Sequence, residues 1–330
     1  MLRPRSKDAD AVARLALRDA GLPWNGLLRH ASSTNNMVFL SGNNIVRINR
    51  NGKNRLQREA LLCQSLPNLP WTPSIVADGT VDDSEYLIVE QKPGSPLARW
   101  WPDMRESQRD DAIEQLAACM RAIHFTEIPE GLKPLDSPPQ MLGNPSNPIL
   151  PILQGLQRLR NNRHVGSSVV DELETKVLTL APSIDDYTDT RAVHGDLTFE
   201  NVLWDGSTIT AVLDFEWARG APRDLDLDVI CRFIQWPHLH VDPVVAAHTK
   251  PSDYEGVLRC MARSYPELFS HRNLRQRLAL YGIAFELRAT LQNQPNRPVD
   301  DLGPLHPYTR LLDAATTGGP GARMAKTMFS

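Results

Sequence analysis

The sequence predicts an α+β protein of two lobes, a small β-rich N-terminal lobe and a larger, mainly helical C-terminal lobe. Short β-rich runs gather in the first 91 residues, and apolar positions recur at helical spacing from residue 106 onward. Between them stands Lys92-Pro93-Gly94-Ser95-Pro96, which reverses the chain. The 330 residues are enough for two units that share a cleft. We therefore expect an N-lobe at 1–91, a hinge at 92–96 and a C-lobe at 97–330.

The N-lobe elements follow from local patterns. A first helix has acidic residues at its start and the apolar positions Val12, Leu15 and Leu17 along it. Three β-rich runs come next, broken by a polar loop and by a tight Ser41-Gly42-Asn43 turn. The expected helices are 8–20 and 53–66, and the expected strands are 27–32, 37–40, 44–48, one near 75, and 86–90.

The C-lobe pattern is helical except for one segment of short strands and turns between 192 and 215. Ile113, Leu116, Met120 and Ile123 fall on one face of a helix at 106–125. Further helices are expected at 150–160, 169–180, from 225, near 254 and at 273–291. The proline-rich stretch 128–151 is expected to be irregular, as an insertion over the cleft, and the tail after Thr316 is expected to be loose.

Composition excludes several classes of protein. A net charge of −3 offers no electrostatic footprint for nucleic acid. The sequence contains no run of about 18 apolar residues, so it predicts no membrane span. The basic start of the chain lacks the apolar segment of a secretory signal. The four cysteines have no C-x-x-C spacing, which argues against zinc and disulfides. We expect a cytoplasmic protein, a monomer or weak homodimer, whose partner is a small-molecule substrate.

The strongest chemical signal is His194-Gly195-Asp196-Leu197-Thr198-Phe199-Glu200-Asn201, followed by Asp214-Phe215 after an apolar run. Phosphoryl transfer needs a carboxylate that takes the proton of the attacking hydroxyl, and ligands for a magnesium ion on the phosphates. Asp196 suits the first role, and Asn201 with Asp214 supplies the hard oxygens that magnesium prefers. The H-x-D-x-x-x-x-N spacing matches the protein-kinase catalytic loop. The alternative is a hairpin loop whose Asp and Asn cap turns.

With Gly195 in place of Arg, and Asp214-Phe215 without a following Gly, the segment resembles the aminoglycoside phosphotransferase and choline kinase-like family. That family's later acidic position also appears, in 220–225. The resemblance implies a bilobal protein kinase-like fold with ATP, or GTP, and Mg²⁺ between the lobes. It implies a kinase that phosphorylates a hydroxyl of a small molecule.

The resemblance also assigns nucleotide-binding positions. Arg47 matches the strand residue that contacts the α- and β-phosphates, and Glu59 matches the helix residue that pairs with it. Lys is commoner at that strand position, so Arg47 is a departure, and Lys53 is an alternative phosphate partner. Ser33 and Asn35 lie where a glycine-rich loop would cover the phosphates, and Glu90, Gln91 and Lys92 lie where the backbone would meet the adenine. His124, at the end of the helix at 106–125, is expected to pack or to cap, and His194 is expected to brace the loop by hydrogen bonds.

The acceptor is the least determined part of the prediction. Residues 194–228 hold eight acidic and two basic side chains, of which Asp205, Asp226 and Asp228 are expected on the surface. Glu200, Glu216 and Glu286 are candidates to hold a substrate ammonium, although Glu286 also fits a helix-surface acid. The expected acceptor is therefore an aminoglycoside or amino-sugar antibiotic. A macrolide, homoserine or choline-like alcohol stays open.

Two rival functions remain. A pseudokinase scaffold would be favoured by loss of the base or of the metal ligands, and all three residues are present. A protein kinase is disfavoured because the segment between Asp214 and Asp224 is too short for a typical activation loop.

Overall fold

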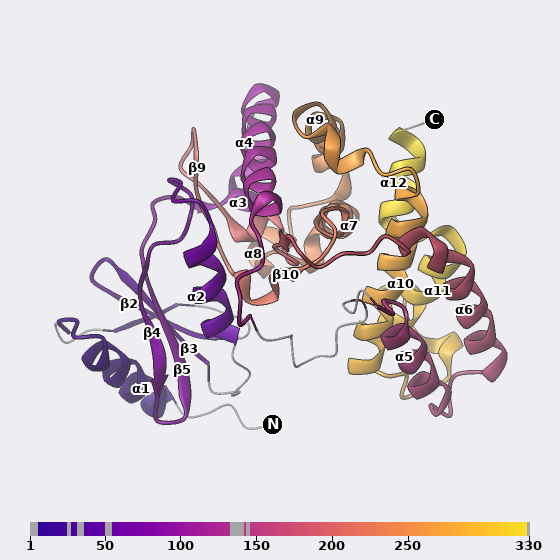
Figure 1. Ribbon diagram of the computed structural model, residues 1–330, viewed down its shortest axis with the longest axis horizontal. Helices are drawn as coiled ribbons and strands as arrows, with labels where there is room; N and C mark the ends of the chain where they lie inside the picture. The colour runs from indigo at the N-terminus through magenta and orange to yellow at the C-terminus, as the bar shows by residue number, and fades with distance from the viewer. Residues whose placement is uncertain are drawn as a thin grey trace.

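The chain folds into two lobes, and the computed structural model describes residues 6–24, 28–31, 36–49, 55–132, 142 and 146–328. In Figure 1 the strand-rich lobe (indigo and purple) lies to the left, and the last helices (orange and yellow) lie to the right. The predicted α+β class, with a β-rich N-terminal and a helical C-terminal region, is confirmed.

The N-lobe is a five-stranded antiparallel sheet in the order β1-β2-β3-β5-β4. Its strands are β1 (Arg29–Ala31), β2 (Met37–Ser41), β3 (Asn44–Asn49), β4 (Ile75–Val81) and β5 (Ser84–Glu90). Successive side chains of a strand point to opposite faces of a sheet. Tyr86 and Ile88 accordingly pack with α1 (Ser6–Asp19), whereas Leu87 packs with α2 (Arg55–Ser65). The α2 face of the sheet is the one that reaches the cleft.

The chain enters the C-lobe through a tight contact at Gly94. This residue has a φ of +97°, and a Cβ here would lie 2.5 Å from the carbonyl oxygen of Trp204. Only glycine tolerates this combination of backbone angle and contact. The next two residues form β6 (Ser95–Pro96), which pairs with β8 (Val202–Trp204), and β8 pairs with β9 (Ile209–Val212). The strand next to the catalytic motif is thus joined directly to the interlobe connection.

The C-lobe is mainly helical. Its predicted central helix, α4 (Glu106–Phe125), buries Ile113, Leu116, Met120 and Ile123 as the spacing indicates. The short strands β7 (Ala192–Val193) and β10 (Arg219–Gly220) pair beside the catalytic motif. The other helices are α3 (Leu97–Trp100), α5 (Leu150–Arg160), α6 (Ser167–Leu180), α7 (Asp224–Gln235), α8 (Pro243–Ala246), α9 (Val257–Ser264), α10 (Leu274–Gln292), α11 (Pro307–Thr317) and α12 (Gly319–Met328).

The expectation of a loose tail after Thr316 is wrong. Gly318 takes a left-handed φ of +87° and ends α11, and α12 then packs against α10 and α7. A Cβ on Gly321 would lie 3.0 Å from the Cβ of Leu278. The glycines that suggested disorder are therefore what allows the last helix to approach α10 closely.

Two of the exclusions can be compared with the structure. Among the residues described, no helix is both long enough and apolar enough to cross a membrane. All four cysteines are buried and none forms a disulfide.

Candidate active site

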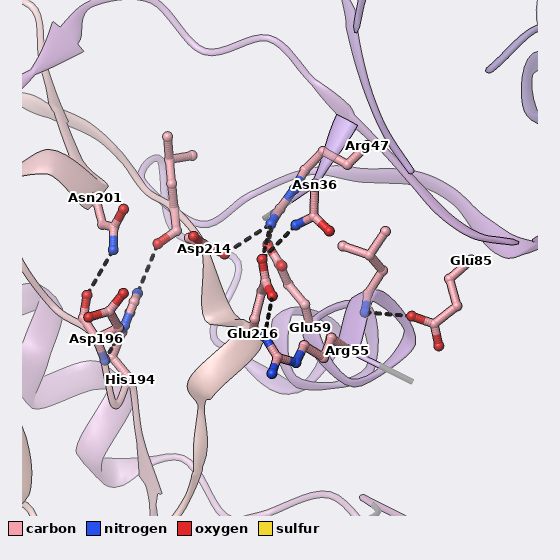
Figure 2. A network of polar contacts seen from close by, with 12 residues as sticks. Asn36, Arg47, Arg55, Glu59, Glu85, His194, Asp196, Asn201, Asp214 and Glu216 are labelled. Carbon is pink, nitrogen blue, oxygen red and sulfur yellow. Dashed lines mark hydrogen bonds and ion pairs between the residues drawn. The ribbon is translucent and has the colours of Figure 1, made fainter. Parts of the chain in front are cut away.

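The catalytic loop between β7 and β8 is closed by its own polar groups (Figure 2). The Asn201 Nδ2 donates to the backbone carbonyl of Asp196 at 2.8 Å, which turns the amide oxygen of Asn201 away from the loop. The Asp196 N–H donates to His194 Nδ1 at 3.3 Å, so His194 Nε2 carries the proton and donates to the carbonyl of Leu213 at 2.9 Å. His194 thus joins the loop to the residue before Asp214, in the bracing position that was expected.

Asp226 binds the backbone of the same loop. The expectation that Asp226 lies on the surface is wrong. It is 0% exposed. Its carboxylate accepts hydrogen bonds from the backbone N–H groups of His194 (2.8 Å) and Gly195 (2.7 Å), and from His124 Nε2 (3.1 Å). Because Asp226 lies in the first turn of α7, the sequence could not distinguish it from an acid that only stabilises the N-terminus of a helix. Here it fixes the backbone that carries Asp196.

Asp214 follows β9 in a left-handed conformation, with φ 66° and ψ 59°. Such a conformation is costly for a residue with a Cβ, and it recurs at functional sites. The side chain is 33% exposed, and its Oδ1 accepts a hydrogen bond from Arg47 Nη2 at 2.9 Å. Together with Asn201 it lines a large cavity between the lobes.

Arg47 is the centre of an ion-pair cluster that joins the lobes. Its Nη1 contacts Glu59 at 2.5 Å, and its Nη2 contacts Asp214 at 2.9 Å and Glu216 at 3.2 Å. Burial lowers the pKa of Arg47, but the three carboxylates outweigh it and raise that pKa, so the guanidinium stays charged. Burial raises the pKa of Glu59, opposed by Arg47. The expected Arg47–Glu59 pair is present, and both side chains are largely buried.

Glu216 is drawn into the same cluster rather than toward an acceptor. It is 1% exposed, accepts a hydrogen bond from Asn36 Nδ2 at 2.5 Å, and pairs with Arg55 at 3.4 Å (Figure 2). Its position after Asp214 suggested a carboxylate that binds the substrate, but its carboxylate contacts Arg47, Arg55 and Asn36 of the N-lobe instead. Asn36 and Arg55 were not predicted, because partners 180 and 161 residues away leave no sequence signal.

The large cavity, of about 790 Å³, is bounded by both lobes. Ile45 and Val89 form an apolar wall, and Glu90, Gln91 and Lys92 line it where the sheet meets the interlobe connection. Asp196, Asn201, Asp214 and Glu200 line its C-lobe side. Ser33, Asn35 and the alternative phosphate partner Lys53 lie outside the described residues.

A second pocket, of about 220 Å³, lies on the other side of Asp196. The two cavities share Asp196 and His240 as lining residues, so they border one another at these two residues. Burial and the nearby Asp214 raise the pKa of Asp196 to about 7, against the opposing charges of Arg288 and Arg232. A carboxylate with a pKa near neutrality is suited to accept a proton from a hydroxyl.

Glu286 does not line either of these cavities. It is 1% exposed, and its carboxylate pairs with Arg310 of α11 at 2.9 Å. The expectation that this helix residue faces the acceptor is wrong, because the face of α10 that carries it packs against α11. The pocket is instead lined by its helical neighbours Phe285 and Arg288.

The metal-ligand prediction can be compared with the donor atoms. Within the described ranges, no group of three or more His, Cys, Asp or Glu side chains forms a ready-made metal cage. Asn201 and Asp214 instead offer one amide oxygen and one carboxylate to the large cavity that they line. This fits magnesium, which binds through one or two protein oxygens and otherwise through phosphates and water.

Two lobes, a cleft between them, and an Asp-Asn-Asp set at its base define the protein kinase-like class of phosphotransferases. The chain matches the phosphotransferase enzyme family over residues 27–258, and it belongs to that family.

Similar proteins agree with this assignment. An aminoglycoside 3'-phosphotransferase of Streptomyces fradiae is 28% identical over 166 residues, a match that spans 49% of this chain and 58% of that relative. The aminoglycoside phosphotransferase APH(2'')-Ib with ADP bound has a TM-score of 0.63 at 15% identity, over 93% of this chain and 97% of its own. The ternary complex of APH(2'')-IIa with streptomycin and ATP has the same TM-score and identity over 92% and 97%. APH(4)-Ia gives 0.56 at 17% identity over 97% and 99%.

Proposed function

We propose that the protein transfers the γ-phosphate of ATP, bound in the large cavity, to a hydroxyl of a small molecule bound in the pocket beside it. The observation that carries this proposal is that the two cavities meet at Asp196. One donor and one acceptor would then flank a single carboxylate, which is the arrangement that in-line phosphoryl transfer needs. GTP is an alternative donor.

In the proposed reaction the acceptor oxygen forms a bond to the γ-phosphorus, and the bond between that phosphorus and the β,γ-bridging oxygen breaks. The acceptor proton passes to Asp196, and the nucleoside diphosphate leaves. Asn201 and Asp214 would hold magnesium, which when bound neutralises charge on the phosphates. Arg47, kept charged and oriented by Glu59, would contact the phosphates as a fork of N–H donors.

Further proposals concern the peripheral parts of the nucleotide site. Glu90, Gln91 and Lys92 would border the nucleotide base, and Ser33 and Asn35 would cover the phosphates. The hinge proposed at 92–96 is supported by the backbone contact at Gly94, which fixes where the chain passes between the lobes.

The aminoglycoside acceptor is favoured by the relatives, one of which is an aminoglycoside 3'-phosphotransferase. A role in antibiotic resistance would follow from it. Of the three carboxylates expected to hold an ammonium, only Glu200 remains in a cavity without an ion pair to an arginine among the described residues. Its cavity is the one assigned here to the nucleotide. The proposal of an aminoglycoside acceptor is therefore supported by the relatives and not by the residues that line the pocket.

A cytoplasmic monomer or weak homodimer that binds neither nucleic acid nor membrane remains our proposal. Its supports are the net charge of −3 and four cysteines without a disulfide.

Acceptor-dependent phosphate transfer tests the proposed function. The purified chain would be mixed with magnesium and γ-labelled ATP or GTP, and with aminoglycosides, amino sugars, macrolides and small alcohols in turn. Label should move to an acceptor in the wild type and not in Asp196→Asn. If the chain binds nucleotide but transfers label to nothing, the pseudokinase alternative is correct.

A further inference from the structure

The pocket beside Asp196 is basic. Three arginines line it, Arg219, Arg232 and Arg288, against two aspartates, Asp196 and Asp228. Asp228, which was expected on the surface, is 1% exposed and in direct contact with Arg232 one helical turn away, while its Oδ1 is buried without a hydrogen-bond partner among the described residues. Arg219 and Arg288 then line the pocket with Asp196 as its unpaired acid, while Asp226 and Glu286 attract them from outside the lining residues.

Arg288 has no hydrogen-bonded acid among the residues described. Its guanidinium lies over Trp217, 4.7 Å from the ring centroid, and 5.1 Å from that of Phe285, and its Nε is buried without a hydrogen-bond partner. Arg219 donates from Nη1 to the Trp217 carbonyl at 3.1 Å, and its Nε is likewise buried and unpartnered. A buried N–H donor without an acceptor lowers the stability of the fold unless a ligand accepts a hydrogen bond from it.

The electrostatics of the arginines support the same conclusion. Burial and the neighbouring Arg219 lower the pKa of Arg288 to about 10, and burial lowers the pKa of Arg219. Burial lowers the pKa of Arg232 to about 9. Desolvation and mutual repulsion therefore outweigh attraction by acids at this site. A bound anion would offset both effects.

The acidic residues that predicted a cationic acceptor are engaged elsewhere. Of the eight acids in 194–228, six are engaged by another group of the protein. Asp205 caps an exposed turn, Asp214 and Glu216 pair with Arg47, Asp224 pairs with Arg277, Asp226 binds His124 and the loop backbone, and Asp228 contacts Arg232. Glu200 lines the nucleotide cavity, so Asp196 alone of the eight is left unpaired in the pocket.

We propose that the acceptor is a small hydroxylated anion, whose carboxylate or phosphate is held by Arg219 and Arg288 while its hydroxyl faces Asp196. This inference rests on the proposed kinase function. An arginine fork matches either oxyanion. The volume of about 220 Å³ lies below the range of about 300–1,000 Å³ usual for drug-sized ligands, which favours a small acceptor over a multi-ring antibiotic.

A charge-matched panel tests the proposal. Glucose, glucosamine, gluconate and glucose 6-phosphate share a polyol chain and differ in charge, and gentamicin and streptomycin represent the aminoglycosides. Transfer from labelled ATP and calorimetric binding would both be measured. Gluconate or glucose 6-phosphate should have the highest kcat/KM, and comparison of the two distinguishes carboxylate from phosphate recognition. The KM should rise with salt concentration.

Variants of α10 then assign the effect to Arg288. Arg288→Gln should raise the KM of the anionic acceptor about 10- to 100-fold, because a charge-assisted contact made throughout the reaction is lost. The kcat should change little at a pH well above the pKa of Asp196, which Arg288 helps to lower. Arg288→Lys, which keeps the charge without the fork, should lie between. Arg275→Gln, on an exposed part of the same helix, is the matched control and should behave as wild type. Magnesium-ATP binding and thermal unfolding report whether each variant is folded.

The outcomes separate the inference from the function on which it rests. If glucosamine or an aminoglycoside is phosphorylated best, the proposal of an anionic acceptor is wrong and the kinase proposal still stands. Failure of both anions to bind, or an unchanged KM in a folded Arg288→Gln, would also overturn it. Anions that bind without any transfer would instead contradict the kinase proposal.

Discussion

Replacing Asp226 with asparagine removes the charge that holds the catalytic loop while keeping the shape of the side chain. The native carboxylate accepts three hydrogen bonds, two from the backbone N–H groups of His194 and Gly195 and one from His124. Asparagine has one oxygen, so its NH₂ group must face at least one of these donors. An unsatisfied buried donor costs about 1–3 kcal/mol, and the remaining bonds lose their charge assistance. We expect the free energy of unfolding to fall by about 2–4 kcal/mol.

Activity should fall as well, because Asp196 sits on the backbone that Asp226 fixes. A displacement of about 1 Å costs on the order of 100-fold in rate, so kcat should drop by that order while magnesium-ATP still binds. Urea unfolding and steady-state kinetics would be measured beside Asp205→Asn, an exposed acid of the same segment expected to change little. If Asp226→Asn unfolds within about 0.5 kcal/mol of the wild type and keeps its kcat, the bracing role of Asp226 is wrong.

The same variant has a pH signature. Burial raises the pKa of Asp226, but hydrogen bonds from His124 and the loop backbone outweigh it, and the pKa lies below its usual value. A carboxylate with a depressed pKa contributes stability above its unfolded pKa of about 3.9 and loses it as the pH falls through the folded value. The stability gap between wild type and Asp226→Asn should therefore be full at neutral pH and close in acid.

Five further substitutions have defined outcomes. Asp196→Asn should lower kcat by at least about 100-fold while nucleotide titrations stay near wild type, and retention of a tenth of kcat would remove it as the base. Asn201→Ala and Asp214→Ala should weaken ATP binding only when magnesium is present, Asp214→Ala more severely because a full charge is lost; equal affinity with and without a chelator in the wild type would contradict this. Arg47→Ala should weaken nucleotide binding and also lower stability, since Glu59 is left buried and unpaired, as calorimetry and urea unfolding would show. Gly321→Val should cost about 1–3 kcal/mol of stability through its contact with Leu278, without effect on the KM for ATP.

The sequence predicted what is encoded locally. The helix at 106–125 follows from apolar spacing alone, and the catalytic motif follows from residue types at fixed gaps within one loop. The pairing of Arg47 with Glu59 was also accessible, because the resemblance to a known family placed one on a strand and the other on the next helix.

What could not be predicted depends on contacts between distant parts of the chain. Glu286 meets Arg310 because α10 packs against α11, and no periodicity shows which face of a buried helix will find a cation. The acidic excess near the motif looked like a site for an ammonium, although half of those eight acids pair with an arginine or a histidine from another element. The basic pocket arises only when α10 brings Arg288 next to Arg219 and Trp217.

Phosphorus NMR of a single reaction mixture tests the central claim most directly. The protein would be incubated with magnesium, ATP and the best acceptor of the charge-matched panel, and the β- and γ-phosphate signals would be followed with time. We predict that the γ-signal of ATP is replaced by a phosphomonoester signal as ADP accumulates, and that Asp196→Asn leaves ATP unchanged. An acceptor that stays unmodified while ATP persists, or while only inorganic phosphate appears, would contradict the assignment of this site to phosphoryl transfer.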